Sequence, residues 1–190
     1  MHIWGLINDV LFWTLVAVLI WTAYILAFHG GVPNIGTAPA IQRRAIDVLK
    51  SFSTTRAGAP FSIIDLGSGD GSFTRLIARN IPQARVTGLE MSYQSYQWSR
   101  LQKKLRRISN LDYTRGDMFA HDLSTVDVVV MYQSLFWMER LGKKLHAELK
   151  PGTLVICNRF QLGDGWKPVE HLQVQTLYPH QKDLYIYNKV

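Results

Sequence analysis

Residues 61–90 carry the most specific chemical pattern in the chain, with the sequence FSIIDLGSGDGSFTRLIARNIPQARVTGLE. An apolar run predicts a buried strand, and Gly67, Gly69 and Gly71 follow it at alternate positions. Glycine allows a sharp turn with positive φ and brings bare backbone against a ligand. A helical pattern and a second predicted strand then lead to Glu90. This order is typical of a nucleoside-cofactor half-site, in which the loop and the helix N-terminus hold the polar end of the ligand and the acid binds ribose hydroxyls.

The spacing of the glycines bears on which cofactor the loop binds. A dinucleotide fingerprint has the form G-x-G-x-x-G, whereas this loop has G-x-G-x-G with Asp65 two residues before the first glycine. The loop, followed by Glu90 nineteen residues after Gly71, resembles motif I of the class I S-adenosylmethionine-dependent methyltransferases. A nicotinamide enzyme and an α/β domain without a ligand remain the alternatives.

This resemblance implies a role for each polar group around the loop. Asp65 is expected near the ammonium group of S-adenosyl-L-methionine, and Glu90 on its ribose. Asp117 follows the third predicted strand, where an acid or amide of these enzymes commonly meets the adenine amino group; capping of a loop is the alternative role. The cofactor-binding residues that we predict are Asp65, Gly67, Ser68, Gly69, Gly71, Glu90, Asp117 and Met118.

The rest of the domain supplies a sheet that positions these groups. Further strands are predicted at 111–114, 126–131, 153–158, 171–177 and 184–188. The run VDVVVM at 126–131 is the most continuous β-branched apolar run, which is typical of a central parallel strand buried on both faces. The last two strands would form a hairpin at an antiparallel edge. We therefore predict an α/β fold with a Rossmann-like, seven-stranded class I methyltransferase sheet, in a minimal version whose helices between strands three, four and five are short or missing.

Three more helices are predicted, at 40–52, 91–108 and 136–149. The first of them can support the sheet or close over the cofactor. The apolar positions of the second are Tyr93, Tyr96, Leu101, Leu105 and Ile108. Its other face holds the basic residues Arg100, Lys103, Lys104, Arg106 and Arg107. Such a charge run is usually a solvated face, and attraction to anionic lipid is the next interpretation. RNA binding is disfavoured, because no aromatic stacking platform accompanies the charges.

Residues 10–28, VLFWTLVAVLIWTAYILAF, form a run without a charge. At about 1.5 Å per residue the run reaches roughly 28 Å, close to the thickness of a bilayer's hydrocarbon core. It predicts an N-terminal transmembrane helix. A buried core helix and a cleaved signal peptide are the alternatives, although no Lys or Arg precedes the run and no A-x-A site follows it.

Charge and composition limit the partners of the chain. Residues 1–28 contain no Lys or Arg, and all 21 basic residues lie after them. The positive-inside rule then places the catalytic domain on the cytoplasmic side of a bacterial inner membrane, or on the matrix side of a mitochondrial inner membrane. With one cysteine and six histidines in no HxxxH or HExxH spacing, no metal site is predicted. The predicted division is an anchor at 1–29, a Gly- and Pro-containing linker with a helix at 30–60, and a methyltransferase domain at 61–190.

Nearly the whole chain resembles the membrane-anchored protein-lysine methyltransferases that act on the ATP synthase c subunit and the adenine nucleotide translocase. The matching parts are the N-terminal span, the loop from Val32-Pro33 to Pro39, residues 65–71, Glu90, and the segments 126–130, 145–151 and 157–166. The chain departs from the family's pattern at Ser72, at 132–138 and at 157–161, around the acceptor pocket. The resemblance implies a membrane-protein lysine as methyl acceptor. The alternatives are a lipid, a quinone precursor or another small molecule, or a non-enzymatic membrane-tethered scaffold.

A methyltransferase of this kind needs no covalent nucleophile, because the sulfonium methyl of the cofactor is already a strong electrophile. The protein must align donor and acceptor and keep water out. A lysine acceptor must first lose a proton, since its reference pKa is about 10.4. We hypothesise that Asp70 and Tyr132 are the catalytic residues that share this task with solvent, while desolvation lowers the pKa of the amine. The alternative role of Asp70 is to stabilise the loop.

Overall fold

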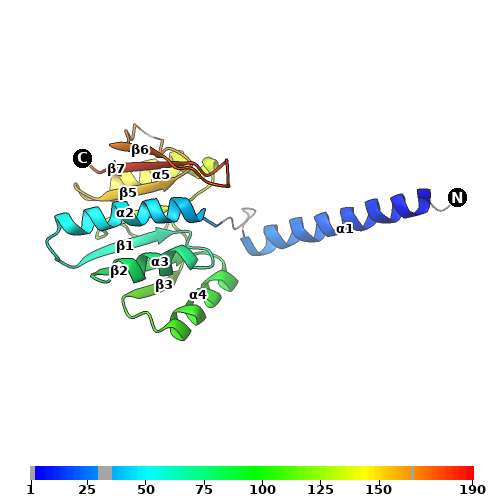
Figure 1. Cartoon of the computed structure of the whole chain (residues 1–190), viewed down its shortest axis with the longest axis horizontal. Coiled ribbons are helices and arrows are strands. Elements are labelled where there is room, and N and C mark those ends of the chain that lie inside the picture. The colour runs from blue at the N-terminus through cyan, green and yellow to red at the C-terminus, as the bar shows by residue number, and fades with distance from the viewer. Residues whose placement is uncertain (1–2, 30–35, 164) are drawn as a thin grey trace. The chain divides into compact units, whose positions relative to one another are not determined.

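The computed structural model of the chain describes residues 3–29, 36–163 and 165–190. These residues belong to two compact units, one at 1–35 and one at 36–190 (Figure 1). Most of the predicted linker, including Val32 and Pro33, lies outside the described residues. The predicted boundaries of the anchor, the linker and the methyltransferase domain stay predictions.

The first unit contains the helix α1 (Ile3–His29). Its segment Gly5–Tyr24 has a mean hydropathy of 1.8, is long and apolar enough to cross a membrane, and has none of its residues buried within the structure. Thr14 and Thr22 each donate a hydrogen bond to the carbonyl four residues earlier, at 2.7 and 2.8 Å. These hydroxyls therefore need no partner outside the helix, as an apolar environment requires. The helix begins seven residues before the predicted span at 10–28.

The second unit is built on a seven-stranded sheet in the order β3-β2-β1-β4-β5-β7-β6. The strands are β1 (Phe61–Leu66), β2 (Ala84–Glu90), β3 (Leu111–Arg115), β4 (Val128–Met131), β5 (Leu154–Asn158), β6 (Glu170–Gln173) and β7 (Asp183–Asn188). β1 to β5 are parallel, and β7 runs antiparallel to both β5 and β6. The predicted class I methyltransferase sheet with an antiparallel edge is confirmed.

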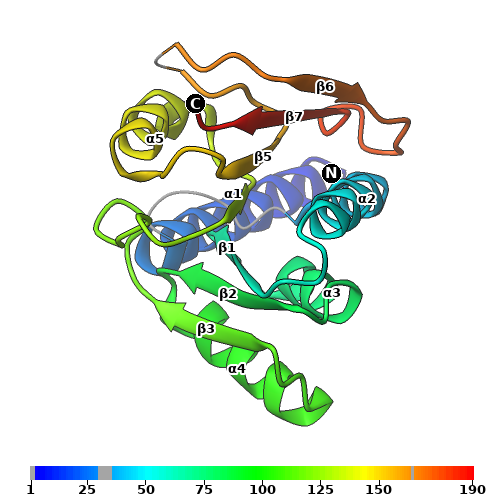
Figure 2. The same cartoon turned by 90° about the vertical axis from the view of Figure 1, so that its left-hand side faces the viewer.

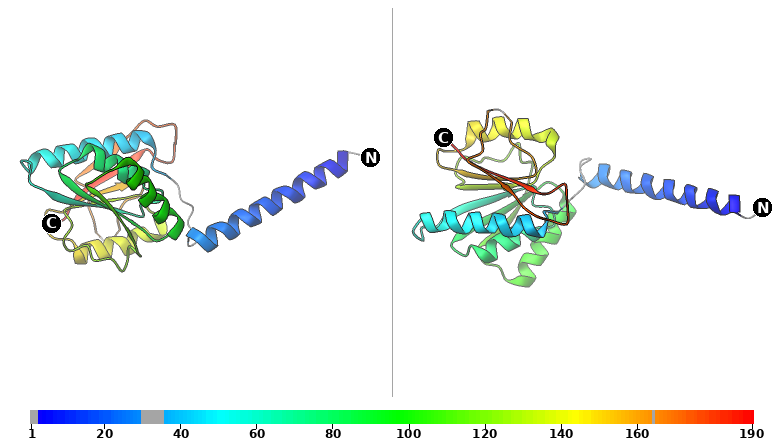
Figure 3. Two further views of the ribbon diagram at one scale, coloured as in Figure 1. Left: turned by 90° about the horizontal axis from the view of Figure 1, so that it is seen from below. Right: turned by 45° about the horizontal axis from the view of Figure 1, so that its top comes forward.

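Helices cover both faces of this sheet (Figures 2 and 3). The helices are α2 (Pro39–Thr55), α3 (Ser72–Asn80), α4 (Tyr93–Arg106) and α5 (Leu135–Glu148). α2, α3 and α4 lie on one face, and α5 lies on the other. Each face of the sheet has its own hydrophobic core. Neighbouring residues of β1 belong to different cores, because Ile63 packs under α2 and α3 while Ile64 packs under α5. Both faces of the central strands are thus buried, as parallel sheets require.

Two expectations about the helices were wrong. The helix between β4 and β5 is not short, because α5 has 14 residues; the connection from β3 to β4 does lack a helix. The predicted apolar face of α4 is buried only in part, because Tyr96 and Ile108 pack against the core while its other members do not. α4 buries Ser99 and leaves Tyr93, Leu101 and Leu105 exposed, at 53%, 47% and 68% of their surface. The reason is steric, since the buried face of α4 lies against the glycine loop, where a small side chain fits.

Helix α2 is held to the sheet near both of its ends. Before its start, the Ala38 N–H donates to Gln181 Oε1 at 2.7 Å. After its end, Arg56 Nη2 donates to Asp127 Oδ1 at 2.8 Å, and Lys150 Nζ donates to the same oxygen at 2.9 Å. Burial alone would raise the pKa of Asp127, but hydrogen bonds from a backbone N–H and from Lys150 outweigh it and lower the pKa to about 2. These contacts fix the start of α2 beside the carboxyl end of β5 and the amino end of β7.

Candidate functional site

The loop between β1 and α3 turns through three glycines with positive φ, at 72° for Gly67, 57° for Gly69 and 71° for Gly71. Residues with a side chain rarely adopt this conformation. The N–H groups of Gly67 and Ser68 both donate to the carbonyl of Leu89 near the end of β2, at 2.8 and 3.0 Å. The loop is therefore tied to the strand that carries Glu90.

Glu90 joins the loop to the start of α4. Its Oε2 accepts a hydrogen bond from the Gly69 N–H at 2.8 Å, and its Oε1 accepts one from the Ser92 N–H at 2.7 Å. An ionised carboxylate has about four acceptor positions, so two remain for further donors such as ribose hydroxyls. The sequence indicated only the ligand-facing role of Glu90. Its contact with the loop became evident from the structure.

Two side chains that the sequence analysis did not single out support the loop from below. The Tyr113 hydroxyl on β3 donates to the Gly71 carbonyl at 3.0 Å, and Ser99 Oγ on α4 donates to the Gly69 carbonyl at 3.2 Å. Burial raises the pKa of Tyr113 to about 12, which keeps its hydroxyl protonated and able to donate. The sequence offered one signal of this packing. Gly88 lies in the middle of a strand, and such a glycine often marks the close approach of another group.

Asp65 lies at the end of β1 under the loop and is 5% exposed. Its Oδ2 accepts a hydrogen bond from Thr74 Oγ1 on α3 at 2.6 Å. Burial raises the pKa of Asp65 to about 7. The hydrogen bond from Thr74 opposes this rise, and the negative charges of Glu90 and Asp70 add to it. A cation beside Asp65 would therefore stabilise its ionised form.

The other predicted acids lie at the surface. Asp70 Oδ1 accepts a hydrogen bond from the Ser72 N–H at 2.9 Å, at the start of α3. Asp117 Oδ1 accepts one from the Phe119 N–H at 2.9 Å, in the turn after β3. Both carboxylates thus cap local turns, which fits the loop-stabilising alternative for each. Met118 packs against the core on the α5 side of the sheet.

Tyr132 and Gln133 follow β4, next to the end of β1. The Tyr132 hydroxyl lies 3.5 Å from Arg159 Nη1, and Arg159 has a positive φ of 74°. Gln133 Nε2 donates to the Leu66 carbonyl at 2.6 Å and occupies the space that a side chain at Gly67 would need. Within the described part of the chain, no hydrogen bond joins Asp70 to Tyr132. The structure therefore joins Glu90 to the glycine loop and places Asp65 beneath that loop, but it does not bring the two predicted catalytic residues together.

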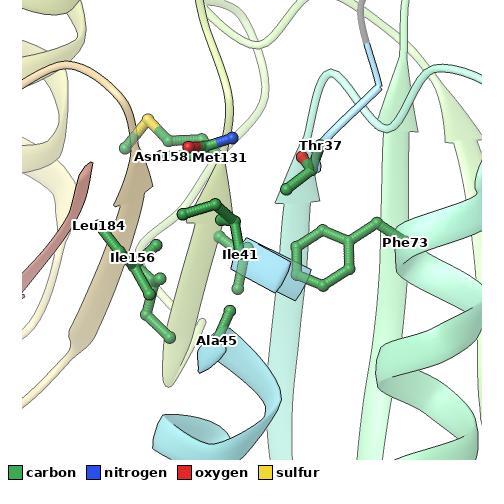
Figure 4. Close-up of a pocket in the computed structure, with 9 residues that line it drawn as sticks. Thr37, Ile41, Ala45, Phe73, Met131, Ile156, Asn158 and Leu184 are labelled. Atoms are coloured by element: carbon green, nitrogen blue, oxygen red, sulfur yellow. The ribbon is translucent and has the colours of Figure 1, made fainter. Parts of the chain in front are cut away.

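A pocket lies beside this network, under the first turns of α2 (Figure 4). Its lining comes from α2 and from Thr37, two residues before it, from α3, and from the ends of β4, β5 and β7. The lining residues are Thr37, Ile41, Ala45, Phe73, Val130, Met131, Ile156, Asn158 and Leu184. In Figure 4, Thr37, Met131 and Asn158 lie at one end, and the apolar residues Ala45, Ile156 and Leu184 lie below them.

The orientation of Asn158 in this pocket follows from its neighbour Gln181. Gln181 accepts from the Ala38 N–H through Oε1 and donates to the Gly36 carbonyl through Nε2, so its amide has one possible orientation. Asn158 Nδ2 then donates to Gln181 Oε1 at 3.3 Å. Asn158 is 3% exposed, and its Oδ1 has no hydrogen-bond partner among the described residues. A buried acceptor without a partner is costly, which marks Asn158 as a place for a donor from a ligand.

No group of three or more His, Cys, Asp or Glu residues that could hold a metal ion occurs in the described part of the chain.

Comparisons with known proteins bear on the chemistry of this site. A family model described as the ANTKMT methyltransferase domain matches residues 65–170. The protein-lysine N-methyltransferase of Saccharolobus islandicus strain REY15A is 29% identical over 150 residues, covering 76% of this chain and 86% of the relative.

Solved structures share the fold of the second unit. An RNA methyltransferase from Salinibacter ruber in complex with S-adenosyl-L-homocysteine is 25% identical with a TM-score of 0.69, covering 81% of this chain and 93% of that one. The N-methyltransferase NodS from Bradyrhizobium japonicum WM9 is 17% identical with a TM-score of 0.59, covering 80% and 97% of the two chains. The latter similarity concerns the fold alone.

The space around Tyr113 leads to a first prediction. A Cβ added at Gly88 would lie 2.6 Å from Cδ1 and Cε1 of Tyr113 and 2.9 Å from Ser68 Oγ. Gly88→Ala is therefore expected to lower the free energy of unfolding by about 1–3 kcal/mol, the usual cost of overpacking. Chemical denaturation of the detergent-solubilised chain measures the difference.

Gly116→Ala is the matched control, because its Cβ would meet only Leu89 Cδ1, at 3.3 Å. It should change stability much less. In a Tyr113→Leu background the colliding ring is absent, so Gly88→Ala should cost less than in the parent. An equal cost in both backgrounds would contradict this account of the packing.

Proposed function

Because the chain belongs to the ANTKMT methyltransferase domain family and is an S-adenosyl-L-methionine-dependent methyltransferase, we propose that it methylates lysine side chains of a membrane protein. The observation that carries the choice of lysine is the similarity to a protein-lysine N-methyltransferase over most of both chains. The proposed location at a membrane rests on α1, whose segment Gly5–Tyr24 has the length and composition of a membrane span.

The residues around the glycine loop suit the cofactor. Gly67, Ser68, Gly69 and Gly71 would present their backbone to the ligand, and Ser68 Oγ is buried without a partner among the described residues. Glu90 retains free acceptor positions for ribose hydroxyls. When bound, the cofactor supplies an electrophilic methyl group on its sulfonium.

Five further residues complete the proposed site. Asp65 would face the cofactor's ammonium group, for which its buried carboxylate offers the counter-charge. Asp117 and Met118 would contact the adenine, since they follow β3 and Gly116 donates to the Glu90 carbonyl at 3.1 Å. Asp70 and Tyr132 would receive the proton of the acceptor amine, directly or through solvent.

The pocket with Asn158 is the proposed place of the acceptor nitrogen. It lies at the carboxyl ends of β4 and β5, where open α/β sheets bind their ligands. An amine carries N–H donors, and Asn158 Oδ1 is a buried acceptor that lacks one. Apolar walls next to this oxygen suit a nitrogen that must be neutral to react, because desolvation disfavours the ammonium form.

A membrane location adds to the proposed reaction. Confinement at a bilayer raises the effective concentration of a substrate held in the same membrane. We propose that the second unit lies on the cytoplasmic side of a bacterial inner membrane, or on the matrix side of a mitochondrial one, since every Lys and Arg follows the apolar segment. Accordingly, residues 1–29 would be the anchor, 30–60 a linker with α2, and 61–190 the catalytic domain.

Transfer of labelled methyl from S-adenosyl-L-methionine tests the proposed function. The solubilised full chain is incubated with membranes from a host that lacks the enzyme, and label is expected on a small hydrophobic protein. Mass spectrometry of that protein should place the methyl group on a lysine. Glu90→Ala should abolish transfer, because it removes the ribose acceptor and the contact with Gly69 together.

The other outcomes separate the alternatives. Label found only in the lipid extract would identify a lipid or quinone precursor as acceptor, and label in RNA would contradict a protein acceptor. Asp70→Asn and Tyr132→Phe test the proposed proton acceptors. If neither variant alters the pH dependence of the rate, these two residues do not take the proton.

The pKa of Asp65 predicts how cofactor binding depends on pH. In the ligand-free protein the carboxyl is mostly protonated below pH about 7, whereas the ammonium group of the cofactor favours its ionised form. Affinity should therefore rise as the pH is raised through about 7, with a slope of at most about tenfold per pH unit below that value. Calorimetric titration from pH 5.5 to about 7.5, below the pKa of about 7.7–8.0 of an α-amino group, measures this slope.

Two conservative variants make this test specific. Asp65→Asn should bind the cofactor more weakly and with little pH dependence over the same range. Thr74→Val removes the hydrogen bond that stabilises the carboxylate, so it should move the midpoint to higher pH. An unchanged slope in Asp65→Asn would assign the pH dependence to another group.

Asn158→Leu tests the acceptor pocket. Loss of one hydrogen bond to the neutral acceptor amine, worth about 0.5–1.5 kcal/mol, should lower kcat/KM for the acceptor by roughly 2- to 13-fold. Cofactor affinity should change little, because the glycine loop and Glu90 are intact. Asn188→Leu, at the opposite end of the sheet, is the matched control. A parallel loss of cofactor affinity would show that Asn158 acts only through the position of α2.

A further inference from the structure

The solvent-facing side of α4 carries an apolar stripe. Trp98, Leu101 and Leu105 are spaced by three and four residues, so they share one side of the helix. They are 52%, 47% and 68% exposed. Ser99, which is fully buried, lies on the side that contacts the glycine loop. The largest apolar side chains of α4 therefore face away from the domain.

The charges on α4 also differ from those on α2 and α5. α4 has the sequence YQSYQWSRLQKKLR, which contains four basic residues and no acid. Arg100 and Lys104 are exposed beside the apolar stripe. By contrast, the exposed charges of α2 include Arg44 with Asp47, and those of α5 include Lys143 with Glu139. Only on α4, among these three helices, does an exposed apolar stripe adjoin charges of a single sign.

We propose that this face of α4, made by Trp98, Leu101 and Leu105 with Arg100 and Lys104, docks on an anionic bilayer surface. Leucine and tryptophan with basic neighbours are typical of helices that lie in the membrane interface. Basic residues near an anionic surface are attracted to it, and tryptophan prefers the headgroup level. The absence of any acid from the helix makes its charge complementary to anionic lipid.

The proposal rests on the proposed membrane location of the chain. Six residues lie between the end of α1 at His29 and the start of the second unit at Gly36, which makes seven steps from one Cα to the next. An extended chain spans at most about 3.6 Å per residue, so this stretch reaches no more than roughly 25 Å. If α1 spans a bilayer, the second unit is confined to its surface and must present some face to the headgroups.

Docking through α4 would suit the reaction. The helix begins after Glu90 at the carboxyl ends of the strands, and its buried side holds the Gly69 carbonyl through Ser99. The outer side of the same helix would lie on the membrane. The cofactor loop would then be held close to the interface in which a membrane-protein lysine is presented.

The experiment places a fluorescent label on the full chain in lipid nanodiscs. Cys157 is the only cysteine and is fully buried, so a new surface cysteine is labelled selectively. Leu101→Cys carries the label on the stripe, and Lys143→Cys carries it on α5, across the sheet, as the matched control. Nanodiscs contain brominated lipid in phosphatidylcholine alone or in a 3:1 mixture of phosphatidylcholine and phosphatidylglycerol.

Bromine should quench the label at position 101 in the anionic discs and not the label at position 143. Arg100→Gln with Lys104→Gln should lower the ratio of docked to free domains by roughly fivefold for each residue, the factor that corresponds to about 1 kcal/mol per basic group. High salt should have the same effect. Equal quenching at both positions, or no response to phosphatidylglycerol, would overturn the proposal.

Two further measurements separate the docking proposal from the proposed membrane location and the proposed methyl acceptor on which it rests. Resistance to alkaline carbonate extraction reports whether α1 is inserted. An inserted chain with an unquenched position 101 contradicts the docking surface alone, whereas an extractable chain contradicts the membrane location and the surface with it. If position 101 is quenched but the chain transfers no methyl group to a membrane protein, the docking surface is supported and the proposed acceptor is wrong. A label at 101 that responds to single-stranded RNA instead of to anionic lipid would assign the face to nucleic acid.

Discussion

The carboxylate of Glu90 is the constraint on which the cofactor side of the molecule depends. One oxygen holds the Gly69 N–H and the other holds the Ser92 N–H, at 2.8 and 2.7 Å. The loop after β1, the end of β2 and the start of α4 therefore meet at a single side chain. A hydrogen bond to a charged group is worth about 1.5–3 kcal/mol, so loss of this carboxylate would release three elements at once. The same carboxylate is the proposed ribose ligand, which makes loop shape and cofactor binding inseparable.

A second constraint follows from how closely these elements approach one another. The Tyr113 ring passes over Gly88 to reach the Gly71 carbonyl, and a Cβ at Gly71 would lie 2.7 Å from Ser99 Oγ. Each contact requires a small residue on one side. Because Gly88 has no side chain, the Tyr113 hydroxyl can reach the loop, and the Tyr113 ring packs in the core beneath it. The loop is thus supported by groups from β3 and α4 that are far from it in the sequence.

These distances explain which parts of the molecule could be predicted from the sequence. The glycines, Asp65 and Glu90 lie within one strand-helix-strand unit, and the buried strands are recognisable because burial on both faces leaves continuous apolar runs. By contrast, Gln181 holds Ala38 across 143 residues, and Asn158 acquires its orientation only through that contact. No local sequence pattern predicts a hydrogen bond between residues so far apart in the chain. The acceptor side is also where the chain departs from its family's pattern, so the resemblance was least informative there.

The failed prediction for α4 follows from the same packing. Apolar periodicity predicts which face of a helix is buried only if the partner surface can accept large side chains. Under α4 the partner is the glycine loop, and it accepts Ser99. At this contact the side chain of the helix must therefore be small, and the large residues Trp98, Leu101 and Leu105 lie outside. A helix whose outer face met only water would gain nothing from three such residues, whose contiguous exposure favours association. Three exposed apolar residues beside the exposed basic residues Arg100 and Lys104 therefore fit a surface that a lipid interface covers.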